Sequence, residues 1–178
     1  MSADAAGSSS ASSSVSSSSP QPTEHDLARL RDAIAVAKSA REHGNHPFGS
    51  VLTDADGAVV LQAENSVTTD GDCTAHAETA LIRLASHRYT PAELSDFTLY
   101  TSCEPCAMCA GAIYWAGVGR VVFALGEDEL LAMTGSNPEN PTMSLPCRAV
   151  FAAGQRDTTV VGPALRAEAT EPHLDFWN

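Results

Sequence analysis

Apolar residues recur at helical spacing near the start of the chain. From His25 onward, Leu27, Leu30, Ile34 and Ala37 fall three or four positions apart, and Gly44 ends the pattern. Residues at this spacing lie on one face of a helix. The sequence therefore predicts an amphipathic helix over residues 25–44.

Shorter segments follow, and their patterns alternate between strand and helix. A hairpin is predicted from a strand at 48–53, a turn at 54–57 and a strand at 59–63. Helical patterns cover residues 74–88 and 106–117, the second after Pro105. Strands are predicted at 97–102, 120–125 and 158–162, with a short helix at 145–153 and a last helix from Pro163.

This order of elements predicts the fold class. Helices that alternate with strands favour an α/β protein, here a three-layer α/β/α sandwich with a mixed central sheet. No internal repeat and no linker interrupts residues 23–178, so we expect one domain there. Residues 1–22 are rich in serine, and Asp4 is their only charge, so we expect a disordered tail.

The same composition bears on location and partners. The tail has neither a basic start with an apolar run nor an arginine, so no export or organelle signal is expected. No stretch approaches the roughly 18 apolar residues of a membrane span, and we expect a cytoplasmic protein without membrane contact. The chain has 10 basic and 22 acidic residues, net −12, which disfavours nucleic acid as a partner while leaving a local basic patch open.

Three of the five cysteines form an unusual run. Cys103, Cys106 and Cys109 read C-x-x-C-x-x-C, while Cys73 and Cys147 lie apart. An odd count without an export signal favours metal or thiol chemistry over disulfides. The run permits an iron–sulfur cluster with a fourth thiolate, a closed zinc site that includes Cys103, or a catalytic zinc with one cysteine to spare.

A second motif favours the catalytic zinc. His76 and Glu78 stand at one predicted helix start, and Cys106 and Cys109 follow Pro105 at the next. One imidazole and two thiolates bind zinc and leave a fourth position for water, whose pKa the metal lowers toward ~7. A carboxylate that does not bind the metal can then move the proton of that water. The combination H-x-E and P-C-x-x-C is the signature of zinc-dependent base deaminases.

Longer stretches resemble the cytidine-deaminase-like superfamily. They are HPFGSVL, ENSVTTD, TAHAETALIRLA and LYTSCEPCAMCAGAIYWAGVGRVVF, which together cover most of residues 25–125. The run CEPCAMCAGAIYWA is most like bacterial guanine deaminases. EPCAMCAGA with GRVVF is also similar to bacterial tRNA adenosine deaminases, and fungal cytosine deaminases share the two metal motifs. The segment MTGSNPENPTMSLPCRAV departs from the guanine deaminase pattern.

The resemblance implies roles for particular residues. His76, Cys106 and Cys109 would hold zinc, and Glu78 would transfer protons, with Cys103 a bystander before Pro105. Substrate contacts would come from Asn65, Phe48, Ala75, Trp177 and an acid of the 126–131 segment, for which we choose Glu127 over Asp128 and Glu129. Backbone N–H groups near Ser102 to Glu104 are further candidates, for orienting the attacking water or the amine. The other histidines are expected on the surface or in loops: His25, His43, His46, His87 and His173.

We therefore expect a zinc-dependent hydrolase of purine metabolism that converts guanine to xanthine and ammonia. The alternatives are a tRNA-specific adenosine deaminase, a deaminase of cytosine or of a nucleoside such as guanosine or cytidine, and a zinc-stabilised binding module without activity. The resemblance also implies a homodimer.

Overall fold

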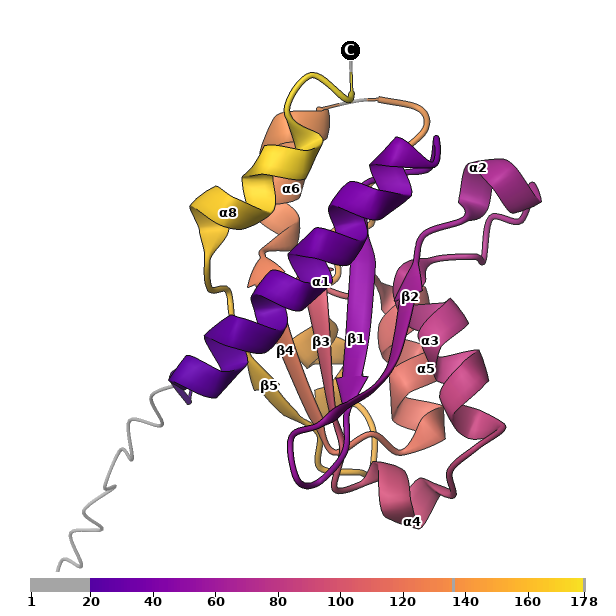
Figure 1. Ribbon diagram of the computed structural model, residues 1–178, viewed down its shortest axis with the longest axis vertical. Coiled ribbons are helices and arrows are strands. Elements are labelled where there is room, and N and C mark those ends of the chain that lie inside the picture. The colour runs from indigo at the N-terminus through magenta and orange to yellow at the C-terminus, as the bar shows by residue number, and fades with distance from the viewer. Residues whose placement is uncertain (1–19, 136, 178) are drawn as a thin grey trace, which may run out of the picture.

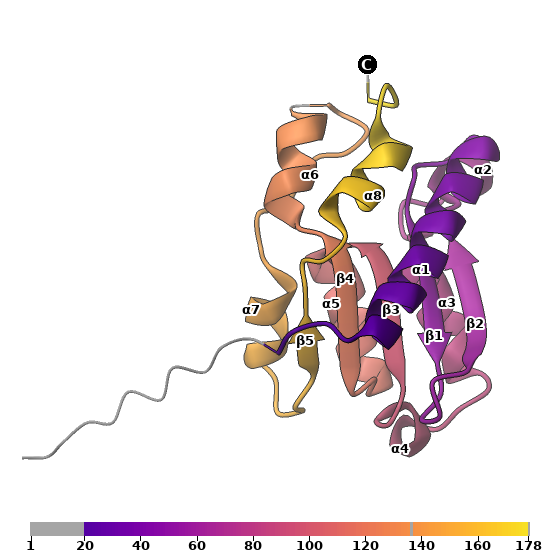
Figure 2. The same ribbon diagram turned by 60° about the vertical axis from the view of Figure 1, so that its left-hand side comes forward.

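The computed structural model describes residues 20–135 and 137–177. Its five-stranded sheet has the order β2-β1-β3-β4-β5 (Figures 1 and 2). The strands are β1 (Gly49–Thr53), β2 (Val59–Glu64), β3 (Thr98–Cys103), β4 (Arg120–Leu125) and β5 (Thr159–Val161). β1 runs antiparallel to β2 and β3, whereas β3, β4 and β5 are parallel. The predicted mixed sheet is confirmed.

Helices cover both faces of this sheet (Figures 1 and 2). α1 (Glu24–Glu42) and α8 (Arg166–Thr170) lie on one face, and α3 (Ala77–Ser86), α5 (Ala107–Ala116) and α7 (Cys147–Ala152) lie on the other. Successive strand residues point to opposite faces, so Leu99 enters the core under α3 and α5 while Tyr100 enters the core under α1. The three-layer sandwich is therefore confirmed.

Local chemistry explains how α1 starts and how it docks. Thr23 caps the helix, and its side chain exchanges hydrogen bonds with Asp26 in a capping box. Gly49 lies against α1, where a Cβ would collide with the backbone of Ala33 and Ala37. Only glycine lets β1 approach the helix this closely.

Several predicted boundaries were wrong, and short helices were missed. The last helix begins at Arg166 and not at Pro163, because Leu165 has a φ of 59°, outside the helical region. The unpredicted elements are α2 (Val67–Asp70), α4 (Pro91–Leu94), α6 (Glu127–Thr134) and the 3₁₀ helix Glu171–His173. They span at most eight residues, too few for a clear periodic pattern.

The expected tail, residues 1–22, lies outside the described residues except for 20–22. Within the described ranges, no helix combines the length and the apolar character that crossing a membrane requires.

Candidate active site

Two helix starts meet beside the carboxyl end of the sheet. His76 is the N-cap of α3, and Cys106 is the N-cap of α5, which follows directly on β3. Neither side chain makes a cap hydrogen bond to its helix, and both line the cavity beyond the helix ends. Unpaired N–H groups at such ends favour negative charge, which suits thiolates.

The side chains at these starts form what we call the metal group: His76, Cys106 and Cys109. Their ligand atoms all lie within 4.8 Å of one another. His76 Nδ1 is 3.7 Å from Cys106 Sγ and 3.5 Å from Cys109 Sγ. A tetrahedral ion with Zn–S of about 2.3 Å and Zn–N of about 2.0 Å requires N···S distances of about 3.5 Å. The donor set and its spacing therefore fit zinc.

One thiolate forms readily in the metal group. The hydrogen bond from Cys109, helped by that with His76, lowers the pKa of Cys106 to about 4 against the opposing effect of burial. The hydrogen bond with Cys106 raises the pKa of His76 and of Cys109 in turn. Metal binding would therefore displace the protons of these two side chains.

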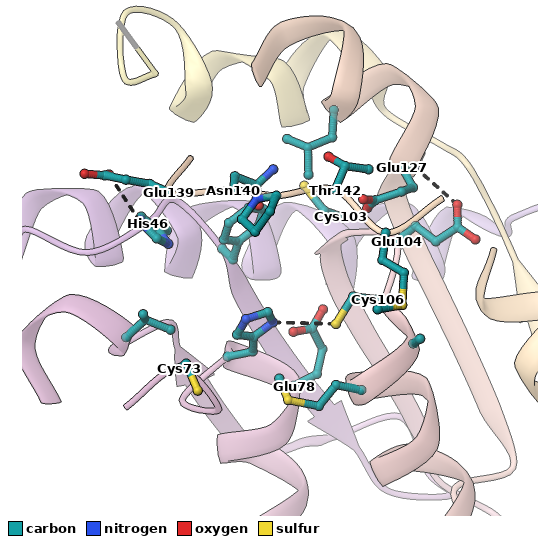
Figure 3. Close-up of a pocket in the computed structure, with 18 residues that line it drawn as sticks. His46, Cys73, Glu78, Cys103, Glu104, Cys106, Glu127, Glu139, Asn140 and Thr142 are labelled. Carbon is teal, nitrogen blue, oxygen red and sulfur yellow. Dashed lines mark hydrogen bonds and ion pairs between the residues drawn. The ribbon is translucent and has the colours of Figure 1, made fainter. Parts of the chain in front are cut away.

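Glu78 lies beside the metal group, and Figure 3 shows its side chain close to that of Cys106. Its side chain is buried, and Thr101 Oγ1 donates a hydrogen bond to Oε1 at 2.8 Å. Oε2 lies 3.5 Å from Cys109 Sγ. Burial, and next the charge of Cys106, raise the pKa of this carboxyl. A carboxyl so placed, with a fixed orientation, can accept and return protons.

A cavity of about 320 Å³ opens over these groups (Figure 3). We call Glu78 and the metal group the metal floor. Phe48 and Val67 line one side, and a second side, which we call the C-terminal wall, consists of Glu127, Leu130, Asn140, Thr142 and Met143 with their neighbours 139 and 141. Small-molecule sites are of this size and are mostly apolar with a few polar groups.

The structure places the predicted substrate residues differently from one another. Phe48 and Glu127 line the cavity, but Asn65, Ala75 and Trp177 are not among its lining residues. Asn65 is buried, and its Nδ2 has no hydrogen-bond partner among the residues that the structure describes. The backbone N–H and C=O of Ala75 are both hydrogen-bonded, to Asp72 and Ser66.

Trp177 lies behind the cavity rather than on it. Its ring is 6.1 Å from that of Phe48, and its Nε1 donates to His173 Nδ1 at 3.2 Å. The expectation that His173 lies on the surface or in a loop was wrong, because this imidazole belongs to the 3₁₀ helix and is buried, with its Nε2 3.5 Å from Cys103 Sγ. Burial lowers the pKa of His173 to about 4, so it is neutral.

Sequence patterns missed several residues at the cavity. Glu104, His46 and Asn140 all line it, and Glu104 adjoins the metal motif where only its backbone was considered. His46 Nε2 lies 3.6 Å from Glu139 Oε2, so it links two loops at the rim. The position of Glu104 in the motif was the one signal available, since the other contacts join residues far apart in sequence.

The remaining cysteines stand apart from the metal group. Cys103 lines the cavity, Cys147 is buried at the start of α7, and Cys73 is exposed. In the described part of the chain, the cluster of potential metal ligands is His76 with Cys106 and Cys109. Cys103 is not in it, which favours an open site over a closed four-ligand one.

Comparison with known proteins identifies the family. The model of the cytidine and deoxycytidylate deaminase zinc-binding region matches residues 23–125. The chain belongs to this family. It is a deaminase of the cytidine-deaminase-like fold, and zinc is its cofactor.

Individual relatives differ in substrate. A protein named probable cytosine deaminase from Schizosaccharomyces pombe is 43% identical over 161 residues, 90% of this chain and 98% of the relative. Guanine deaminase from Bacillus subtilis is 51% identical over 96 residues, 53% of this chain but only 61% of the relative. The structure of guanine deaminase from Nitrosomonas europaea has a TM-score of 0.70 at 25% identity, over 85% of this chain and 83% of that one.

Proposed function

We propose that this chain hydrolyses the amino group of a free purine base, with guanine giving xanthine and ammonia. The observation that supports guanine is Glu127, a carboxyl on the C-terminal wall of the same cavity that holds the metal floor. Guanine presents N–H donors along one edge, and the carboxyl of Glu127, whose pKa burial raises to about 7, accepts two of them in one plane when it is ionised. The resemblance of residues around the metal floor to a guanine deaminase supports the same substrate.

In this proposal the metal group holds zinc through His76 Nδ1 and the sulfurs of Cys106 and Cys109. When bound, zinc supplies a water of lowered pKa, so that a nucleophile exists at neutral pH. Cys109 is buried, and the side chains of His76 and Cys106 are half-buried at the cavity, which limits the access of competing ligands.

Glu78 moves the protons of the reaction. It accepts a proton from the attacking water and gives it to the ring nitrogen beside the carbon under attack. A C–O bond has then formed. Glu78 takes the second proton of the former water from this oxygen and transfers it to the amine, and ammonia leaves as the C–N bond breaks and the C=O bond forms. Thr101 keeps the carboxyl oriented during both transfers, because its hydroxyl bonds Oε1.

Asn65 and Phe48 are the remaining proposed base contacts, of which Phe48 lines the cavity and Asn65 does not. The unpartnered Nδ2 of Asn65 is a buried donor, and leaving such a group unpaired costs about 1–3 kcal/mol. An acceptor on the base edge would satisfy it. Phe48 offers an aromatic wall for the ring. The proposed contacts of Ala75 and Trp177 stay predictions, and Trp177 reaches the base only through its packing on Phe48.

Cytosine is the second candidate. The match to the S. pombe relative named probable cytosine deaminase covers 90% of this chain and 98% of that protein, whereas the match to guanine deaminase covers 53% of this chain and 61% of that protein. The longer match supports cytosine as an alternative to guanine. A tRNA substrate is disfavoured by the net charge of −12.

An ammonia-release screen tests these options. The zinc-loaded protein is assayed with guanine, adenine, cytosine, their nucleosides, an ammeline-type triazine and an anticodon stem-loop. Highest kcat/KM on guanine supports the proposal, and highest kcat/KM on cytosine replaces it with the second candidate. Absence of ammonia from every substrate, with zinc bound, overturns catalysis and leaves the binding module.

We infer a homodimer in the cytoplasm from the resemblance alone. Sedimentation equilibrium measures the mass of the particle directly, and a monomer at micromolar concentration contradicts the dimer.

A further inference from the structure

The side chain of Glu104 joins the start of α6, on the C-terminal wall, to the start of α7, which follows the wall in the chain. Its Oε2 accepts a hydrogen bond from the backbone N–H of Glu127 at 3.3 Å, and its Oε1 accepts one from the backbone N–H of Cys147 at 2.9 Å. These are the first residues of α6 and α7. Figure 3 shows the carboxylate of Glu104 turned toward Glu127 and away from Glu78.

Neither helix has a side-chain cap of its own at the N-cap position. Gly126 and Pro146 occupy these positions and make no side-chain cap hydrogen bond. The helices have eight and six residues, lengths at which isolated helices are unstable. A carboxylate at a helix N-terminus is stabilising through both its hydrogen bond and its charge. In α6, Glu129 Oε2 accepts from the N–H of Gly126 at 3.1 Å, and Glu104 supplies from outside the helix an acceptor for the next N–H, that of Glu127, as it does for the Cys147 N–H of α7.

The connected elements carry the cavity side of the wall. Glu127 is one of the bonded residues, and the chain between the two helices contributes Asn140, Thr142 and Met143 to the cavity. Glu104 itself stands between Cys103 and Cys106, and its N–H donates to Leu125 O at 2.7 Å. One residue of the metal-binding turn thus holds both ends of the segment that faces the base.

We propose that Glu104 is a positioning residue that fixes the Glu127 carboxyl relative to the metal floor by holding the starts of α6 and α7. The expected effect on kinetics rests on the proposed function. The hydrogen bonds of Glu104 to the starts of α6 and α7 do not depend on it. Glu104 would set how well the base is oriented and would leave metal binding unchanged.

Glu104→Gln tests this in the zinc-loaded full chain. The variant keeps one acceptor oxygen but turns an NH₂ toward a backbone N–H, so one bond is lost. Bonds to a charged group contribute about 1.5–3 kcal/mol, so we expect kcat/KM on the best base to fall by about tenfold or more. We expect hydrogen exchange at the Glu127 or Cys147 amide to accelerate by at least about tenfold, with zinc content unchanged.

A double-mutant cycle separates positioning from general loosening. If Glu104 acts through Glu127, Glu104→Gln costs less than about threefold in a Glu127→Gln background, because the group it positions is gone. Glu93→Gln is the matched control. Glu93 Oε2 accepts from the Thr90 N–H at the start of α4, outside the cavity, so its loss should leave kinetics and exchange in α6 and α7 unchanged.

Three results would overturn the proposal. One is unchanged hydrogen exchange at the Glu127 and Cys147 amides, and another is loss of zinc from Glu104→Gln. The third is a double variant whose loss in kcat/KM equals the product of the losses in Glu104→Gln and Glu127→Gln. Glu104→Asp, which keeps the charge but is one methylene shorter, is the second variant should Glu104→Gln fail to fold. If the wild-type chain deaminates none of the bases, the proposed function fails, and hydrogen exchange still decides whether Glu104 holds the two helices.

Discussion

The metal floor and the C-terminal wall face one cavity but are held in different ways. The floor stands on the starts of α3 and α5, whose buried residues belong to one core with the central strands. The wall consists of α6 and a loop, tied to the floor through the side chain of Glu104. The floor is therefore part of the scaffold, whereas the wall is not. Loops carried on a fixed scaffold can change ligand specificity, and relatives of this chain are named for different bases.

Glu78→Gln should give the largest effect, and it tests whether the floor alone carries the chemistry. The amide can still accept the Thr101 hydrogen bond but cannot take a proton, so we expect kcat to fall by about 10²–10⁴-fold. Zinc content, measured by mass spectrometry of the metal, should match wild type.

A comparison of Glu78→Gln with Glu127→Gln separates the role of the floor from that of the wall. Glu127→Gln, the wall variant, should change which base is deaminated fastest. Glu78→Gln, the floor variant, should lower kcat on every base by a similar factor. A Glu78→Gln enzyme within threefold of wild-type kcat would show that protons move through another group.

Asp26→Asn should give the next largest effect, on stability and not on catalysis. Asp26 is buried and pairs with Arg120 at the start of β4, and Tyr100 donates to it at 3.0 Å. Breaking a fully buried pair costs about 3–5 kcal/mol, and we expect about 2–3 kcal/mol here because Arg120 is partly exposed. Urea unfolding measures this, and kcat/KM should stay within twofold, since the pair lies outside the cavity.

The pH dependence of this difference has a definite sign. Burial acts to raise the pKa of Asp26, but the hydrogen bonds from Arg120 and Thr23 outweigh it and hold the pKa well below its usual range. Stability from a depressed carboxyl pKa is present above the unfolded value of about 3.9 and is lost as pH falls through the folded value. The gap between wild type and variant should therefore shrink below about pH 4. A gap independent of pH would assign the loss to packing.

The same division sets what the sequence could predict. The metal floor follows from local spacing, because His76 with Glu78 and Cys106 with Cys109 each lie within one helix start. The wall depends on contacts that no local pattern carries. Glu104 bonds to Glu127 and Cys147, which lie 23 and 43 residues later in the chain. His173 contacts Cys103, which lies 70 residues earlier. The longer strands were predicted because their apolar pattern is also local. The short helix α6 was missed.

Cys103→Ser should give the smallest effect, and it tests where the floor ends. Cys103 Sγ lies against His173 Nε2, and because His173 Nδ1 accepts from Trp177, the Nε2 carries the proton and donates to the sulfur. A serine hydroxyl can accept the same hydrogen bond, so we expect a stability loss of about 1 kcal/mol or less. Zinc should remain at about one per chain, whereas Cys109→Ser, the matched control within the metal group, should lose it. Loss of zinc from Cys103→Ser would instead make Cys103 a fourth ligand, and a closed site would have no position for the attacking water.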